Sequence, residues 1–107
     1  MGINMLAFLK GEGDLEEDLD DAFAEVGLDC DFRCCGVCRW RHVVEACLGW
    51  DSLWQHSWKT YDQDEVKAWL EDARRRKERV AGLGLDTDRF LRWLERCVEL
   101  GASVIVW

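Results

Sequence analysis

Residues 49–70 (GWDSLWQHSWKTYDQDEVKAWL) decide how the rest of this chain is organised. The stretch contains four of the seven tryptophans, one of the two histidines and the only tyrosine. Trp50, Trp54 and Trp58 are spaced four residues apart, so in a helix their indoles would lie along one stripe. We expect this stripe to belong mainly to the core, because each buried aromatic side chain supplies ~150–250 Å² of contact.

The overall composition is that of one folded domain. The chain has 107 residues, of which 49% are hydrophobic and 34% charged, which is typical of a single globular domain over residues 1–107. It contains no apolar run of membrane-spanning length, and its first residues lack the features of a signal peptide. We therefore expect a cytoplasmic protein whose six cysteines are reduced thiols.

The apolar pattern predicts an α+β fold. Apolar or alternating runs predict strands at residues 3–9, 28–34 and 103–107, and amphipathic stretches predict helices at 14–26, 37–48, from 62 to the glycines at 82 and 84, and at 87–100. The first strand, helix and strand would form a βαβ unit with a right-handed crossover, and the C-terminal strand would pair with either strand of that unit. The expected architecture is a small three-stranded sheet packed against about four helices.

The helix that begins after Asp62 has the clearest boundary. Asp62 is followed three residues later by Glu65, the spacing of a capping box. The helix also carries a basic run, which we expect to be a solvated face paired with Glu71, Glu78 or the acidic N-terminal helix. The run consists of Arg74, Arg75, Arg76, Lys77 and Arg79.

The negative charge is concentrated at the N-terminal end. Residues 1–31 contain ten acidic side chains and one basic side chain (net −9), whereas residues 32–107 contain twelve acids and thirteen bases (net +1), giving the total of −8. Such a surface would attract a basic partner and accelerate association with it. The expected contact residues are the carboxylates of the first helix, namely Glu16, Glu17, Asp18, Asp20, Asp21 and Glu25.

This charge pattern and the small size indicate a class of function. We expect a non-enzymatic protein that binds a basic protein surface, as an inhibitor, an immunity-type protein or a phage anti-defence protein. Its partner would be a nuclease or another nucleic-acid-handling defence protein. Direct binding to nucleic acid is not expected, since phosphate backbones require a broad positive face.

A second hypothesis is binding of a small ligand or a peptide by the aromatic segment at residues 50–61. Ligand pockets are mostly apolar, with a few polar groups that converge on the ligand. The segment offers both kinds of group in Trp54, His56, Ser57, Trp58 and Tyr61.

A third hypothesis is a zinc-stabilised module built from the cysteine cluster between residues 30 and 42. Cys35 and Cys38 have zinc-knuckle spacing, and His42 with Cys34 or Cys30 could complete a tetrahedral site. Against this, Cys30 and Cys34 fall on the apolar face of the predicted strand, where a cysteine is an ordinary small hydrophobic residue. No second ligand pair follows at finger-like distance, so we expect no cofactor.

Catalytic motifs are absent from the sequence. The His56–Ser57 pair would need a third group to orient it, and no nucleophile elbow accompanies it. The chain also has no phosphate-binding loop and no dinucleotide-binding motif. We therefore expect no catalytic residues.

Overall fold

The computed structural model describes residues 2–9, 15–35, 39–51, 53–56, 58–84 and 87–106. Within these residues the chain forms an α+β fold, which confirms the predicted class. The elements in chain order are β1 (Gly2–Phe8), α1 (Leu15–Ala24), β2 (Asp31–Cys35), α2 (Arg39–Leu48), the 3-10 helix η1 (Leu53–His56), β3 (Lys59–Tyr61), α3 (Gln63–Gly82), α4 (Asp88–Leu100) and β4 (Ser103–Val106).

The sheet contains the three predicted strands and one further strand, β3, in the described part of the chain. Its order is β2-β1-β4-β3, and each neighbouring pair is antiparallel. The predicted order of strand, helix and strand at the N-terminus is confirmed, but the right-handed crossover is wrong, since Met5 of β1 pairs with Phe32 of β2 in antiparallel register. Only parallel neighbours need a crossover; here α1 returns the chain in the opposite direction.

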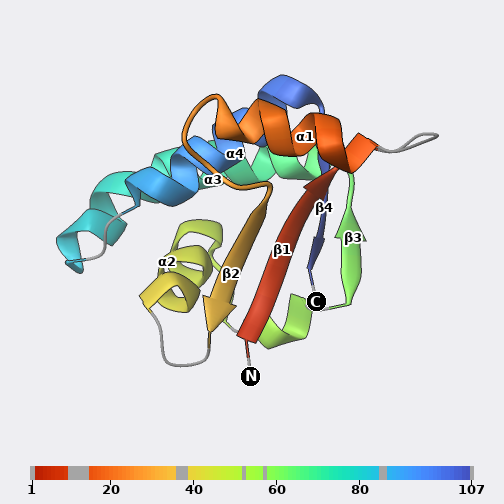
Figure 1. Ribbon diagram of the computed structural model, residues 1–107. Coiled ribbons are helices and arrows are strands. Elements are labelled where there is room, and N and C mark those ends of the chain that lie inside the picture. Colours follow the sequence, from red (N-terminus) through yellow and green to blue (C-terminus); the bar gives the residue numbers. More distant parts are fainter. Residues whose placement is uncertain are drawn as a thin grey trace.

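The helices cover one face of this sheet and one of its ends. Figure 1 shows α3 and α4 running together past the end of the sheet at which β1 finishes, with α1 in front of them, and α2 beside β2. On the covered face Met5, Ala7, Val104 and Val106 are all buried. Alternate residues of a strand face opposite sides, so these four positions place the core between the two central strands and the helical layer.

The helices contribute their apolar stripes to the same core. The apolar spacing predicts a buried side of α3 formed by Val66, Trp69, Leu70, Ala73 and Val80, and all five are buried. On α4 it predicts Phe90, Leu91, Leu94, Cys97 and Val98; the first four are buried and Val98 is partly buried. The sequence pattern did not single out Trp93, which is only 1% exposed. The apolar spacing predicts a stripe of Leu15, Leu19, Ala22, Phe23 and Val26 on the first helix. This prediction is wrong at Val26, which is 37% exposed, because α1 already ends at Ala24.

The expected helix boundaries are largely present. The Asp62 side chain accepts a hydrogen bond of 3.0 Å from the backbone N–H of Glu65, as the capping motif predicts. Gly101, with φ of 65°, adopts the left-handed conformation that ends α4. In the part of the chain described, no helix combines the length and the apolar character that a membrane crossing requires.

The tryptophan-rich stretch is not the single helix that its spacing suggested. Gly49, with φ of 68°, ends α2, and Trp50 follows it outside any helix or strand. The 3-10 helix η1 is short, and Trp58 has φ of 60° immediately before β3. The predicted stripe of Trp50, Trp54 and Trp58 is therefore wrong, since a helical stripe requires continuous helix across all three.

Candidate functional site

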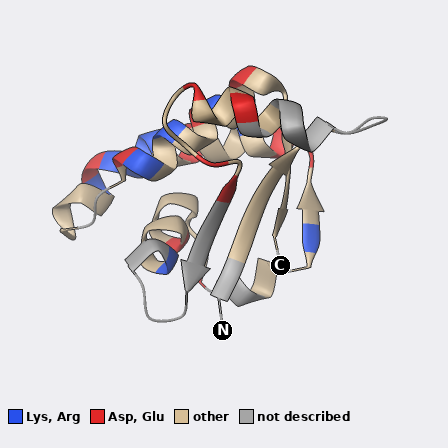
Figure 2. Cartoon of the chain, in the orientation of Figure 1, with Lys and Arg blue, Asp and Glu red and all other residues tan. Residues whose placement is uncertain are grey.

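The acidic helix α1 packs on the core by its apolar residues. Leu19 and Phe23 are buried, whereas Asp21 is exposed. Figure 2 shows acidic residues on α1 and mixed charges along α3 and α4. The side chains of Glu16, Glu17, Asp18 and Asp20 lie outside the described part of the structure, although their backbone belongs to α1.

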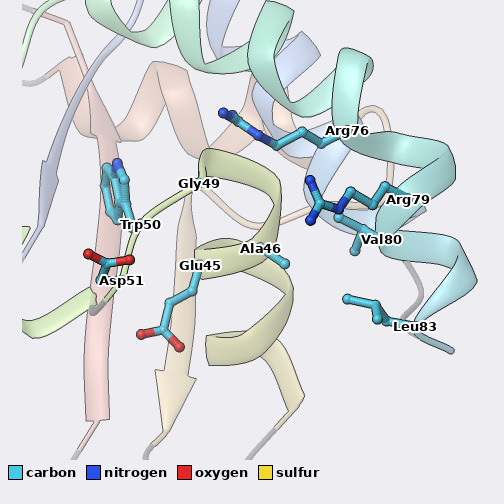
Figure 3. Close-up of a pocket in the computed structure, with 9 residues that line it drawn as sticks. All are labelled: Glu45, Ala46, Gly49, Trp50, Asp51, Arg76, Arg79, Val80 and Leu83. Atoms are coloured by element: carbon cyan, nitrogen blue, oxygen red, sulfur yellow. The ribbon is translucent and has the colours of Figure 1, made fainter.

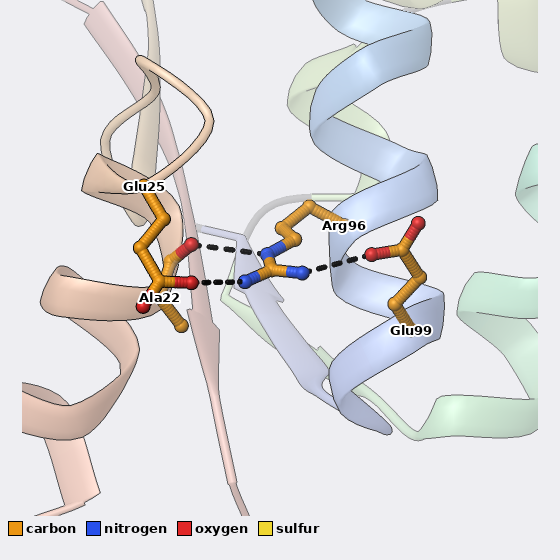
Figure 4. A network of polar contacts seen from close by, with 4 residues as sticks. All are labelled: Ala22, Glu25, Arg96 and Glu99. Carbon is orange, nitrogen blue, oxygen red and sulfur yellow. Dashed lines mark hydrogen bonds and ion pairs between the residues drawn. The ribbon is translucent and has the colours of Figure 1, made fainter.

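Two arginines of α4 hold the C-terminal end of α1. Arg96 donates from Nε to the carbonyl oxygen of Ala22 at 3.0 Å, and its other nitrogens bind Glu25 at 3.2 Å and Glu99 at 2.9 Å (Figure 4). Arg92 donates to the carbonyl oxygen of Val26 at 2.8 Å. Cations at this end complement the negative pole of the helix dipole. Glu25, one of the six predicted contact residues, therefore takes part in holding α1 on α4.

The acids that contact the basic run on α3 differ from the acids that the sequence predicted. Arg75 and Arg76 contact Asp72, Arg74 lies 3.7 Å from Glu95, and Lys77 lies 3.9 Å from Asp88. Most of these side chains are well exposed, so each pair adds little stability. The expectation of a solvated, internally paired face fits these contacts.

Four rings form a compact aromatic cluster, which we define as Trp50, His56, Tyr61 and Trp69. Trp50 stacks on His56 with ring centroids 3.8 Å apart and planes inclined by 8°. The edge of Trp69 meets Trp50 at 5.4 Å, and Tyr61 lies 4.6 Å from Trp69. The Tyr61 hydroxyl is 3.2 Å from Nδ1 of His56.

This contact between Tyr61 and His56 uses polar groups that were expected to converge on a ligand. Burial of the ring, followed by the nearby Lys59 charge, lowers the pKa of His56 below its ordinary value of 6.5. This shift favours the neutral form of the imidazole. Trp54 and Ser57 of the predicted ligand set have no described side chains.

Trp58, the remaining member of that set, faces solvent. Its side chain is 81% exposed, the highest value among the large exposed hydrophobic residues described. Its positive φ is left-handed backbone, which costs an ordinary L-residue roughly 1–2 kcal/mol. An exposed indole on strained backbone is uncommon, and the prediction that the tryptophans are mainly core is wrong for this residue.

A cavity of about 310 Å³ lies between the C-terminal parts of α2 and α3 (Figure 3). Arg76 donates to the carbonyl oxygen of Cys47 at 3.5 Å and so caps the C-terminus of α2. A Cβ at Gly49 would lie 2.8 Å from Cζ of this guanidinium, so a side chain there would displace the end of Arg76, and the positive φ would strain it as well. The cavity is lined by Glu45, Ala46, Gly49, Trp50, Asp51, Arg76, Arg79, Val80 and Leu83.

The cysteine cluster is only partly described. Cys34 and Cys35 form the end of β2 without described side chains, and Cys38 lies outside the described residues. The side chain of His42 is 58% exposed and lies 4.0 Å from Glu45. Among the described residues no group of three or more potential ligands could hold a metal ion. The zinc hypothesis on Cys34, Cys35, Cys38 and His42 stays a prediction.

The residues that join distant elements were not predicted from the sequence. Arg76 was assigned to a solvated face, and Arg92 and Arg96 were given no role. Gly49 gave part of the information needed to predict the Arg76 contact. A glycine after an amphipathic helix marks a turn that a neighbouring side chain can approach closely. No signal within the sequence links Arg96 to Ala22, because that contact depends on how α1 packs on α4.

Comparisons with protein-family models, with curated proteins and with solved structures found no match to this chain. Its function therefore has to be argued from its own residues.

Proposed function

We propose that this protein binds a basic surface of another protein through the acidic helix α1, as an inhibitor or immunity-type protein. The observation that carries the proposal is the uneven charge, with ten acids and one base in residues 1–31. Opposite potentials on two proteins accelerate their encounter and favour the correct partner over wrong ones. The nuclease or defence protein expected from the sequence is the class of partner that such a surface would block.

The packing of α1 supports this proposal. Leu19 and Phe23 fix the side of the helix that faces the core, and Asp21 is exposed. Arg92 and Arg96 hold the helix at its C-terminal end, so its position on the core is defined before any partner binds. A preorganised surface binds more tightly, because less conformational freedom is lost on association.

A charge-reversal pair tests the proposal. The variant Asp20→Lys with Asp21→Lys alters α1, whereas Glu71→Lys with Glu78→Lys makes the same change in net charge at exposed positions of α3. Immobilised wild type and the α3 variant should capture the same basic proteins from a cognate lysate, identified by mass spectrometry, and the α1 variant should lose them. Loss of capture in both variants, or in neither, would contradict a role for α1.

Cytoplasmic location is part of the same proposal. Cys47 and Cys97 are free thiols, and cytoplasmic proteins keep their thiols reduced. Immunofluorescence of a tagged protein together with fractionation would test the compartment.

A second candidate function is binding of a small anionic ligand in the cavity beside Trp50. The observation that favours it is the size of the cavity, about 310 Å³, together with the guanidinium groups of Arg76 and Arg79 in its lining. Ligand pockets begin at about this volume. A thermal-shift screen of phosphate and simple carboxylates should give a stabilisation that Arg79→Gln removes; no shift with any of them would reject this candidate.

A further inference from the structure

The segment that leads into β2 is joined to the buried side of α4. The indole Nε1 of Trp93 donates a hydrogen bond to the carbonyl oxygen of Asp29 at 3.1 Å. Cys97 follows Trp93 by four residues and is buried like it, so the two side chains lie on one side of α4. Cys30 directly follows Asp29. This hydrogen bond therefore brings Cys30 and Cys97, which are far apart in sequence, to the same contact between the segment and the helix.

Both cysteine side chains point into the core. The backbone N–H of Ala7 donates to the carbonyl oxygen of Cys30 at 3.0 Å, which continues the antiparallel pairing of β1 with β2 by one residue. Residues opposite each other in such a pair face the same side of the sheet, and Ala7 is buried on the covered face. Cys30 is partly buried against the core, and Cys97 is fully buried in it. The sheet and α4 therefore present the two cysteines to the same space.

The electrostatics of Cys97 agree with this placement. Burial is the main cause that raises the pKa of Cys97 well above its ordinary value, and the nearby Cys30 raises it further. The interaction between two charges falls with their separation, so this effect is expected for two sulfurs that face the same space. Cys30 and Cys97 are present as thiols in this structure.

We propose that Cys30 and Cys97 form a reversible disulfide when the protein is exposed to hydrogen peroxide. The contact between α4 and the segment before β2 would then be a redox-sensitive cross-link. Cytoplasmic disulfides are usually transient bonds of this kind, formed during oxidation and reduced afterwards by small thiols. The inference concerns the two thiols and does not depend on what binds α1, so the two proposals can succeed or fail separately.

The reaction has two steps. The partly exposed Cys30 reacts first: its thiolate attacks one peroxide oxygen, the O–O bond breaks, and a sulfenic acid forms while the released hydroxide takes the thiol proton as water. The Cys97 thiolate then attacks the Cys30 sulfur, so that the S–S bond forms and the S–O bond breaks. The second hydroxide takes the proton of Cys97 as water. In total, two thiols and one peroxide give one disulfide and two waters.

Burial of Cys97 sets the rate and the effect of this reaction. Because its thiol is buried and its pKa is raised, the second step waits until the contact opens locally. Once formed, the bond encloses β2, α2, α3 and most of α4 in one loop. A disulfide that closes a long loop constrains the unfolded chain, so the Tm of the oxidised protein should rise by roughly 5–15 °C.

Tryptic peptides identify this disulfide directly. Cys30 is the only cysteine in the peptide of residues 11–33, and Cys97 is the only one in residues 97–107. Mass spectrometry of peroxide-treated protein, digested without reductant, should find these two peptides joined with the loss of two hydrogens, and dithiothreitol should separate them. Oxidation of Cys30 to a sulfinic acid without a cross-link, or pairing of residues 11–33 with another cysteine peptide, would overturn the proposal.

Three variants complete the test. Cys30→Ala and Cys97→Ala should each abolish the cross-link, whereas Cys47→Ala removes another buried thiol and should leave it unchanged. Cys30 is only partly buried, so Cys30→Ala should fold like wild type even if Cys97→Ala does not. Peroxide should raise the Tm of wild type but not that of Cys30→Ala. An equal rise in both would show that the stabilisation comes from a different oxidation.

Discussion

Gly49 lies where the end of α2 comes close to α3. Its positive φ ends α2, and the Arg76 guanidinium from α3 occupies the space that a Cβ would need. We expect Gly49→Ala to lower the free energy of unfolding by about 1–2 kcal/mol through backbone strain and displacement of Arg76. Urea denaturation monitored by circular dichroism would measure this change.

Gly82 is the matched control for this prediction. It lies at the end of α3 in ordinary helical conformation, and an added Cβ would meet nothing within 4 Å. Gly82→Ala should therefore be neutral or stabilising by up to about 0.5–1 kcal/mol. Equal effects of the two substitutions would contradict the importance of the contact at Gly49.

His56 makes stability depend on pH. Burial and Lys59 lower the pKa of His56 in the folded protein below 6.5, so the unfolded chain binds the proton more readily. Stability contributed by this residue is complete above that value and is lost as the pH falls through the folded pKa. The urea midpoint of wild type should fall more between about pH 7.5 and about pH 5.5 than that of His56→Gln, which lacks a titrating group. A larger fall in the variant would show that protonated His56 is stabilised instead.

At the scale of the elements, the contact between α1 and α4 depends strongly on Arg96. The Arg96 side chain is only 18% exposed and joins Ala22, Glu25 and Glu99. Arg96→Met should keep much of the volume but leave the Ala22 carbonyl without its donor, which should destabilise the fold by about 1–3 kcal/mol.

Arg74 provides the comparison for Arg96. Its side chain is 58% exposed, and it lies 3.7 Å from Glu95 in a pair on the surface. Arg74→Met should change stability by about 0.5 kcal/mol or less. Chemical denaturation would measure the free energy of unfolding of both variants. A loss at Arg74 as large as at Arg96 would show that ion pairs on the surface of α3 also stabilise the fold.

Elements whose signals are local were predictable from the sequence. The start of α3 follows from Asp62 and Glu65, which meet within one helical turn, and its buried side follows from the spacing of apolar residues. The same applies to β4, whose apolar β-branched residues can only be accommodated in a buried strand. These features depend on interactions within a single segment.

The features that escaped prediction depend on neighbours distant in the sequence. Lys59–Tyr61 is a strand because β4 lies beside it, and three residues are too few for a recognisable alternation. Trp58 was assigned to the core on residue type, but the turn before β3 directs it to solvent. Of the candidate site, the acidic charge was readable from composition, whereas the Arg96 contacts required the fold.

At the scale of the whole molecule, the core can be monitored through its thiols. Cys47 and Cys97 are buried, and burial raises the pKa of Cys47 to about 11 and that of Cys97 well above its ordinary value. Since the thiolate is the reactive form, iodoacetamide should modify both only when the protein unfolds. Peptide mass spectrometry after labelling with and without urea would measure this. Rapid labelling of Cys97 in native buffer would mean that the core opens locally.

The two strands at the centre of the sheet, β1 and β4, come from opposite ends of the described chain, with Met5 paired to Val106. During synthesis on a ribosome, β1 emerges before β4 and pairs with this central neighbour only after the residues between them have been translated. The adjacent helices α3 and α4 can associate earlier, because their contacts are closer in sequence. The edge of β1 that pairs with β4 therefore stays open until β4 has been made, even if β2 already pairs with the other edge, and this is the stage at which chaperones would protect the chain from aggregation.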